Sequence, residues 1–110
     1  MIKLSTYWDV GRLVRFSVSG HAGYAKAGTD IVCAAVSALV YNAINSCEQF
    51  LDARLEVEDD GDELLCVVPA SLREHAGVQL LLGSMVFGIE QTAAQYPKHV
   101  KLKRVSGGAN

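Results

Sequence analysis

The stretch GHAGYAKAGTDIVCAAVSALVYNAINSCEQFL, residues 20–51, decides how this chain folds. From Ile31 to Leu51 its apolar residues recur at helical spacing, which predicts one helix of about 21 residues, or ~31 Å. Either Thr29 or Asp30 would cap the N-terminus of this helix. Its first half is apolar nearly all round, so we expect it to be buried on more than one side.

The segments on either side of this stretch predict strands, because their apolar and polar side chains alternate with a period of two. A turn at residues 9–11 joins the first two strands into a hairpin, and Asp60-Gly61-Asp62 favours a second hairpin. The predicted strands cover residues 2–8, 12–19, 54–59, 63–68 and 100–105.

A second helix is predicted over residues 72–96. Ser71 and Glu74 fit the S-x-x-E capping box ahead of it, and Pro97 ends it. Glycine inside a helix costs ~1 kcal/mol relative to alanine, so glycines here predict close packing against the first helix or a second chain, or a broken start near Gly77. The helix contains Gly77, Gly83 and Gly88.

The predicted order is strand, strand, helix, strand, strand, helix, strand. This order is typical of a small α+β domain in which two helices cover an antiparallel or mixed sheet. A single domain is expected over residues 1–105, followed by a glycine-rich, disordered tail at residues 106–110.

The composition limits the classes of partner. With 110 residues, 50% of them apolar, and a formal net charge of -2, the chain shows no excess of basic residues for nucleic acid or an anionic membrane. No apolar run is expected to serve as a signal peptide or membrane span, so a cytoplasmic protein is expected. Three cysteines without CxxC spacing indicate reduced thiols rather than a disulfide framework.

Cys33 and His21 are the candidate reactive pair. Cys33 would lie in the first turn of the long helix, where unpaired backbone amides and the helix dipole favour a thiolate. His21 ends the preceding strand, and an imidazolium beside the thiol would favour the thiolate further. The same amides could stabilise an oxyanion formed on a peptide carbonyl.

Two further side chains have alternative roles. Asp30 is expected to cap the helix, to orient His21, or both. Ser37, one helical turn after Cys33, either points its hydroxyl toward the site or fills a tight helix contact.

The segment between the reactive pair is rich in small residues and predicts a loop that gates the site. Its residues from Gly23 to Asp30 nearly match the phosphate-binding loop G-x-x-x-x-G-K-[ST], but Thr29 replaces the lysine and Asp30 would repel phosphate, which excludes nucleotide binding. The gating loop consists of Gly20, Ala22, Gly23, Tyr24, Ala25, Lys26, Ala27, Gly28 and Thr29.

The remaining cysteines and histidines predict no metal site or cofactor. Cys33 and Cys47 are about 21 Å apart along one helix and cannot share an ion. Cys47 and Cys66 are expected to be small buried apolar side chains, and His75 and His99 ordinary surface residues.

Together, the residues Gly20-His21-Ala22, Gly28 and Asp30-Ile31-Val32-Cys33-Ala34-Ala35-Val36-Ser37 resemble the signature of the Prp family, the bacterial ribosomal-processing cysteine proteases. The resemblance implies that His21 and Cys33 form a catalytic dyad, supported by Asp30 and Ser37. It also implies a homodimer, and a mobile loop that becomes ordered when substrate binds. The implied substrate is the twenty-seventh protein of the large ribosomal subunit, which loses an N-terminal extension after a pair of phenylalanines. The alternative is a non-enzymatic module that binds a peptide or ribosomal protein, with Cys33 structural.

Overall fold

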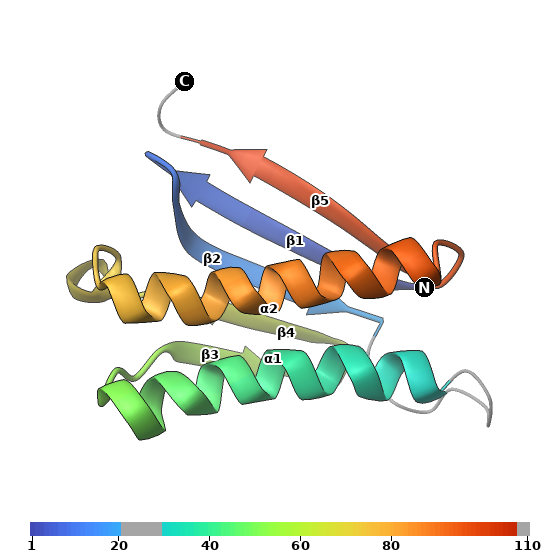
Figure 1. The fold of residues 1–110 in the computed structure, drawn as a ribbon, viewed down its shortest axis with the longest axis horizontal. Coiled ribbons are helices and arrows are strands. Elements are labelled where there is room, and N and C mark those ends of the chain that lie inside the picture. The colour runs from blue at the N-terminus through green and yellow to red at the C-terminus, as the bar shows by residue number, and fades with distance from the viewer. Residues whose placement is uncertain (21–29, 108–110) are drawn as a thin grey trace.

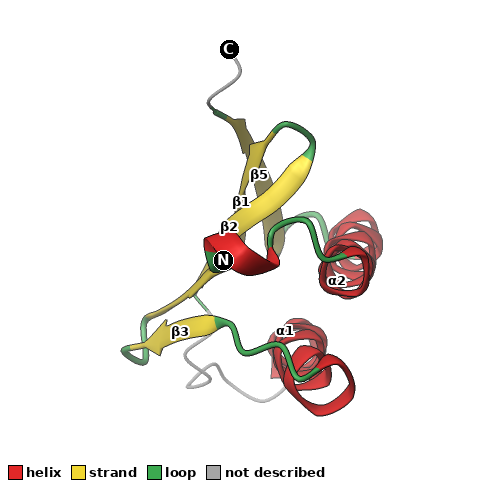
Figure 2. Ribbon diagram, turned by 90° about the vertical axis from the view of Figure 1, so that its left-hand side faces the viewer, coloured by secondary structure: helices red, strands yellow, loops and turns green. Residues whose placement is uncertain are grey.

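A computed structural model describes residues 1–20 and 30–107 and confirms the predicted fold class. Two helices lie on one face of a five-stranded sheet (Figures 1 and 2). The elements are β1 (Ile2–Asp9), β2 (Arg12–Ser19), α1 (Asp30–Leu51), β3 (Glu56–Asp59), β4 (Glu63–Val67), a short 3₁₀ helix η1 (Ala70–Leu72), α2 (Ala76–Gln95) and β5 (Val100–Ser106).

The sheet is mixed, with strand order β3-β4-β2-β1-β5. The hairpins β1–β2 and β3–β4 are antiparallel, as is the β2–β4 pair, whereas β5 returns parallel to β1. The β1–β2 turn has positive φ at Val10 and Gly11, the two central positions of a tight hairpin turn. At the other terminus, the amide of Gly107 donates to the carbonyl of Trp8 at 2.9 Å, and residues 108–110 of the predicted tail lie outside the described residues.

The core lies between the sheet and the helices, because alternate strand residues point toward the helical layer. Leu4, Phe16 and Leu64 are at most 1% exposed, and they come from three adjacent strands. The opposite face of the sheet is covered by neither helix (Figure 2). β4 shows the predicted alternation, with Leu64 and Cys66 buried, whereas all four residues of the edge strand β3 are exposed.

In the single chain, α1 buries one face, so the expectation of burial on several sides is wrong for the described residues. Val36 and Val40 are buried, whereas Ile31 and Tyr41 are 69% and 39% exposed. By length and composition Ile31–Leu51 would also suit a membrane span, contrary to the expectation that no segment would. Packing of its buried face against the core accounts for the apolar composition of this face.

Two of the three helix glycines allow α1 and α2 to approach closely. A Cβ on Gly77 would lie 2.9 Å from Cδ1 of Leu51, and one on Gly88 would lie 3.0 Å from Cδ2 of Leu39. The predicted close packing against the first helix is therefore confirmed for these two residues. A Cβ on Gly83 would meet nothing within 4 Å among the described residues.

The start of α2 differs from the prediction. Residues 70–72 form a 3₁₀ turn, and α2 begins only at Ala76, so the Ser71–Glu74 capping box does not form. His75 is the N-cap instead: its Nδ1 accepts hydrogen bonds from the amides of Gly77 at 3.1 Å and Val78 at 3.3 Å. The imidazole thus satisfies two backbone donors that a helix start leaves unpaired.

Gly83→Ala should raise the free energy of unfolding by about 1 kcal/mol, because alanine is the better helix former and its methyl group meets no neighbour. Gly77→Ala should show no such gain, because its methyl group would press on Leu51. Urea unfolding of both variants and the wild type measures the difference. Equal stabilisation by the two substitutions would contradict the helix contact.

Candidate active site

Cys33 is the fourth residue of α1, and its side chain is 8% exposed at the margin of the core. It therefore lies in the first turn of the helix, at the positive end of the helix dipole. The start of α1 and the end of β2 lie at the same end of the molecule (Figure 1). The thiol is thus held at this end by a helix whose further turns are packed into the core.

Gly20 fixes the end of β2. It has a φ of +78°, and a Cβ at this position would overlap the backbone carbonyl of Met1. Its amide donates to the carbonyl of Asp62 at 3.4 Å, which ties the end of β2 to the β3–β4 turn. A glycine is therefore required where the chain leaves the sheet toward His21.

The structure tests only some of the predicted site residues. His21, residues 22–29 and the side chain of Asp30 lie outside the described part, so the dyad geometry, the roles of Asp30 and the gating loop stay predictions. Ser37 is half-buried one turn after Cys33, and either of its two expected roles is compatible with this position.

The other two thiols are enclosed. Cys47 of α1 and Cys66 of β4 are both 0% exposed, which confirms that they are buried apolar side chains. Burial, and secondarily the neighbouring Cys47, raises the pKa of Cys66 to about 12. Burial also raises the pKa of Cys47. Neither thiol is suited to act as a nucleophile near neutral pH.

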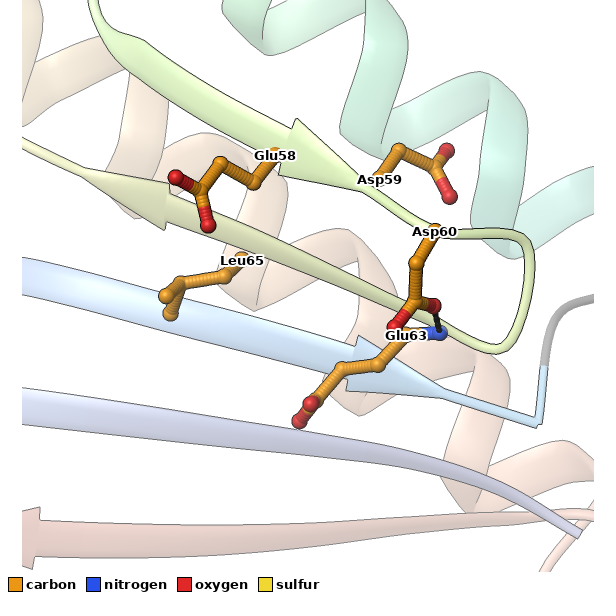
Figure 3. A pocket seen from close by; sticks show the side chains of 5 residues that line it. All are labelled: Glu58, Asp59, Asp60, Glu63 and Leu65. Atoms are coloured by element: carbon orange, nitrogen blue, oxygen red, sulfur yellow. Dashed lines mark hydrogen bonds between the residues drawn. The ribbon is translucent and has the colours of Figure 1, made fainter.

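An acidic pocket of about 210 Å³ lies beside the end of β2 and was not predicted from the sequence (Figure 3). It is lined by Glu58, Asp59, Asp60, Glu63 and Leu65. Among the described residues, no group of three or more His, Cys, Asp or Glu side chains could hold a metal ion. The run of acidic residues at 56–63 was visible in the sequence, but its position beside Gly20 follows only from the sheet.

Hydrogen bonds order the acidic turn. The Asp60 carboxylate accepts hydrogen bonds from the amides of Glu63 at 2.8 Å and Asp62 at 2.9 Å, and these bonds lower the pKa of Asp60. The Tyr41 hydroxyl of α1 donates to the carboxylate of Asp59, a bond that raises the pKa of Tyr41. The β3–β4 hairpin is thereby attached both to α1 and to the end of β2.

A two-layer α+β domain with a nearly buried cysteine in the first turn of its core helix fits a small cysteine hydrolase. Residues 1–101 match the family described as cysteine protease Prp. The ribosomal processing cysteine protease Prp of Bacillus subtilis is 30% identical over 82% of this chain and 84% of its own length. The protein of that name from Staphylococcus aureus strain Mu50 is 23% identical over 86% of this chain and 89% of its own length.

Solved structures have the same fold. SMU.848 from Streptococcus mutans superposes with a TM-score of 0.91 and 31% identity, covering 97% of this chain and 96% of its own. The S. aureus protease Prp in complex with a covalently linked product peptide has a TM-score of 0.83 and 22% identity, covering 94% and 99%. This chain belongs to the Prp family of cysteine proteases.

Iodoacetamide should modify Cys33 of the folded protein and leave Cys47 and Cys66 unmodified at a pH of about 8, near the pKa of a free cysteine. The two protected thiols are 0% exposed, and burial raises the pKa of each. Peptide mass spectrometry locates the modification, and all three thiols should react in denaturant. Modification of Cys66 as fast as Cys33 in the folded protein would contradict the burial pattern.

Proposed function

We propose that this protease removes the N-terminal extension of the twenty-seventh protein of the large ribosomal subunit. The observation that carries the proposal is the family match over residues 1–101, which includes both His21 and Cys33. The curated relatives are named ribosomal processing proteases, and one S. aureus relative was crystallised with a substrate peptide. Cleavage is expected after a pair of phenylalanines, as the resemblance implies.

In the proposed reaction Cys33 is the nucleophile and His21 is the general acid and base. The Cys33 thiolate attacks the scissile carbonyl, and the negative charge on the resulting oxyanion is stabilised by backbone amides at the start of α1. His21 protonates the departing amine, which leaves a thioester between Cys33 and the N-terminal fragment. His21 then removes a proton from water, which hydrolyses the thioester and restores the thiol.

Asp30 and Ser37 are proposed to support the dyad. Asp30 starts α1 and Ser37 follows Cys33 by one helical turn. A carboxylate at a helix N-terminus stabilises the helix, and the same group could orient His21. The supporting role of Ser37 requires its hydroxyl to point toward the reacting thiol, which its half-buried position allows.

The protease is further proposed to act in the cytoplasm as a homodimer. The exposed face of α2 supports a dimer contact: Leu80 and Phe87 are 73% and 61% exposed, and Gly83 between them meets no described neighbour. Large apolar side chains exposed around a small residue on one helix face are typical of helix–helix interfaces.

Incubation with the extended ribosomal protein should produce the shortened form, which mass spectrometry detects. Cys33→Ala and His21→Ala should each reduce the rate by about a thousandfold or more, because the two residues act as one unit. Cys47→Ala, which removes a buried thiol of the same helix, should keep most of the activity. Unchanged cleavage by Cys33→Ala would end the proposed mechanism, and binding without turnover by the wild type would favour the non-enzymatic alternative.

Leu80→Glu and Gly83→Leu should convert the proposed dimer to a monomer, which light scattering measures as a halved mass. Each change places a charge or a bulky side chain on the exposed face of α2. Phe50→Glu is the matched control, because Phe50 is 76% exposed at the end of α1. A monomeric wild type, or a dimer that survives both α2 substitutions, would contradict this interface.

A further inference from the structure

The arginines gather at the end of the sheet opposite Cys33. The chain has five arginines. Arg12 and Arg15 lie at the start of β2, Arg104 pairs with Thr6 near the end of β5, and Arg73 follows η1. Because β2 runs toward the active site and β1 and β5 run away from it, these four residues meet at one end.

Two of these guanidinium groups line one cavity and are held in place by the protein. Arg15 stacks on the ring of Tyr7, with its guanidinium carbon 4.2 Å from the ring centroid. Nε of Arg73 donates to the carbonyl of Val68 at 2.9 Å. The bond of Arg73 uses Nε, and a guanidinium group held in this way is well suited to bind an oxyanion through its terminal nitrogens.

We call this cavity of about 380 Å³ the arginine pocket. Arg15, Arg73, Tyr7, Trp8, Val67 and Val105 are among its lining residues. Asp9 also lines it, so the charged lining residues are two cations and one anion. In residues 1–20 and 30–107, neither Arg15 nor Arg73 forms an ion pair with a carboxylate. The pocket therefore combines apolar side chains with two guanidinium groups and one carboxylate, an excess of one positive charge.

We propose that the arginine pocket binds the phosphodiester backbone of a single-stranded nucleic acid. Beyond the pocket, Arg104 stacks on Trp8 at 4.0 Å and extends the positive charge around the end of the sheet. A chain of phosphates can use several separated cations, whereas a single small anion cannot. Planar guanidinium and aromatic groups also give unpaired bases surfaces on which to stack, which acidic peptide side chains cannot exploit.

This inference is independent of the proposed ribosomal substrate, and it revises the expectation from net charge that nucleic acid is excluded. The net charge of -2 includes six acidic residues at 56–63, on the hairpin tied to Gly20 at the opposite end of β2. Four of them, Asp59, Asp60, Asp62 and Glu63, belong to the turn at that end, whereas Glu56 pairs with Val67, which lines the arginine pocket. A locally positive surface therefore exists on a chain that is acidic overall.

The test is fluorescence anisotropy with labelled, unstructured RNA and DNA oligonucleotides of the same sequence, titrated with the full-length protein at several salt concentrations. The double variant Arg15→Gln/Arg73→Gln should bind at least about tenfold more weakly, and the slope of log K against log salt should become shallower by about 1.4, since each lost single-strand contact contributes about 0.7. Equal affinity for the two oligonucleotides would assign recognition to phosphate alone, and tighter RNA binding would add a contact to the ribose hydroxyl.

The matched control is Arg54→Gln, which removes an exposed arginine that pairs with Glu48 at 2.9 Å and is not among the residues that line the pocket. It should change affinity less than about twofold, as expected when a removed charge makes no phosphate contact. Arg15→Lys keeps the charge but lacks the planar fork, and it should bind more weakly than the wild type. Circular dichroism verifies that each variant is folded. Absence of wild-type binding at low salt, an equal loss in Arg54→Gln, or displacement of the oligonucleotide by an equally charged glutamate peptide would overturn the proposal.

Discussion

The packing of α1 against the sheet and α2 is the constraint on which the position of the candidate nucleophile Cys33 depends. Val36 and Val40 of α1 are buried in the core. Leu39 of the same helix contacts α2 at Gly88, where no side chain blocks its approach. An α-helix of this length is nearly rigid, so contacts in its middle turns fix its first turn as well. The place of Cys33 at the end of the sheet therefore follows from core packing rather than from local interactions alone.

The elements that were predictable from the sequence are those whose pattern is local. Strand alternation and the two hairpin turns gave the strands within two residues of their observed ends, and α1 begins at the predicted cap residue Asp30. The start of α2 depends on distant contacts instead. The Gln79 side chain accepts the amide of Leu13 at 2.9 Å and donates to its carbonyl at 3.0 Å, which joins α2 to β2. The capping-box pattern at Ser71 involves only neighbouring residues, so it could not predict this contact between α2 and β2.

The candidate site shows the same division. Cys33 and its helix-start environment were accessible from sequence, because both depend on residues close together in the chain. The carboxylates beside the end of β2 were not, since the pairing of β4 with β2 places them there. Net charge was the least useful property for predicting binding partners. A sum over the chain conceals that acidic residues gather on the β3–β4 hairpin, and arginines at the end of the sheet where β2 begins.

The separation of these two charged regions limits how they can influence each other. Arg15 precedes Ser19, the last residue of β2, by four residues, or about 13 Å at ~3.3 Å per residue. This length exceeds the Debye length of about 8 Å at physiological salt, so the charge of an anion bound at Arg15 would be partly screened at the end of β2. We therefore propose that a nucleic acid bound there would position the protease rather than alter the proposed chemistry at Cys33.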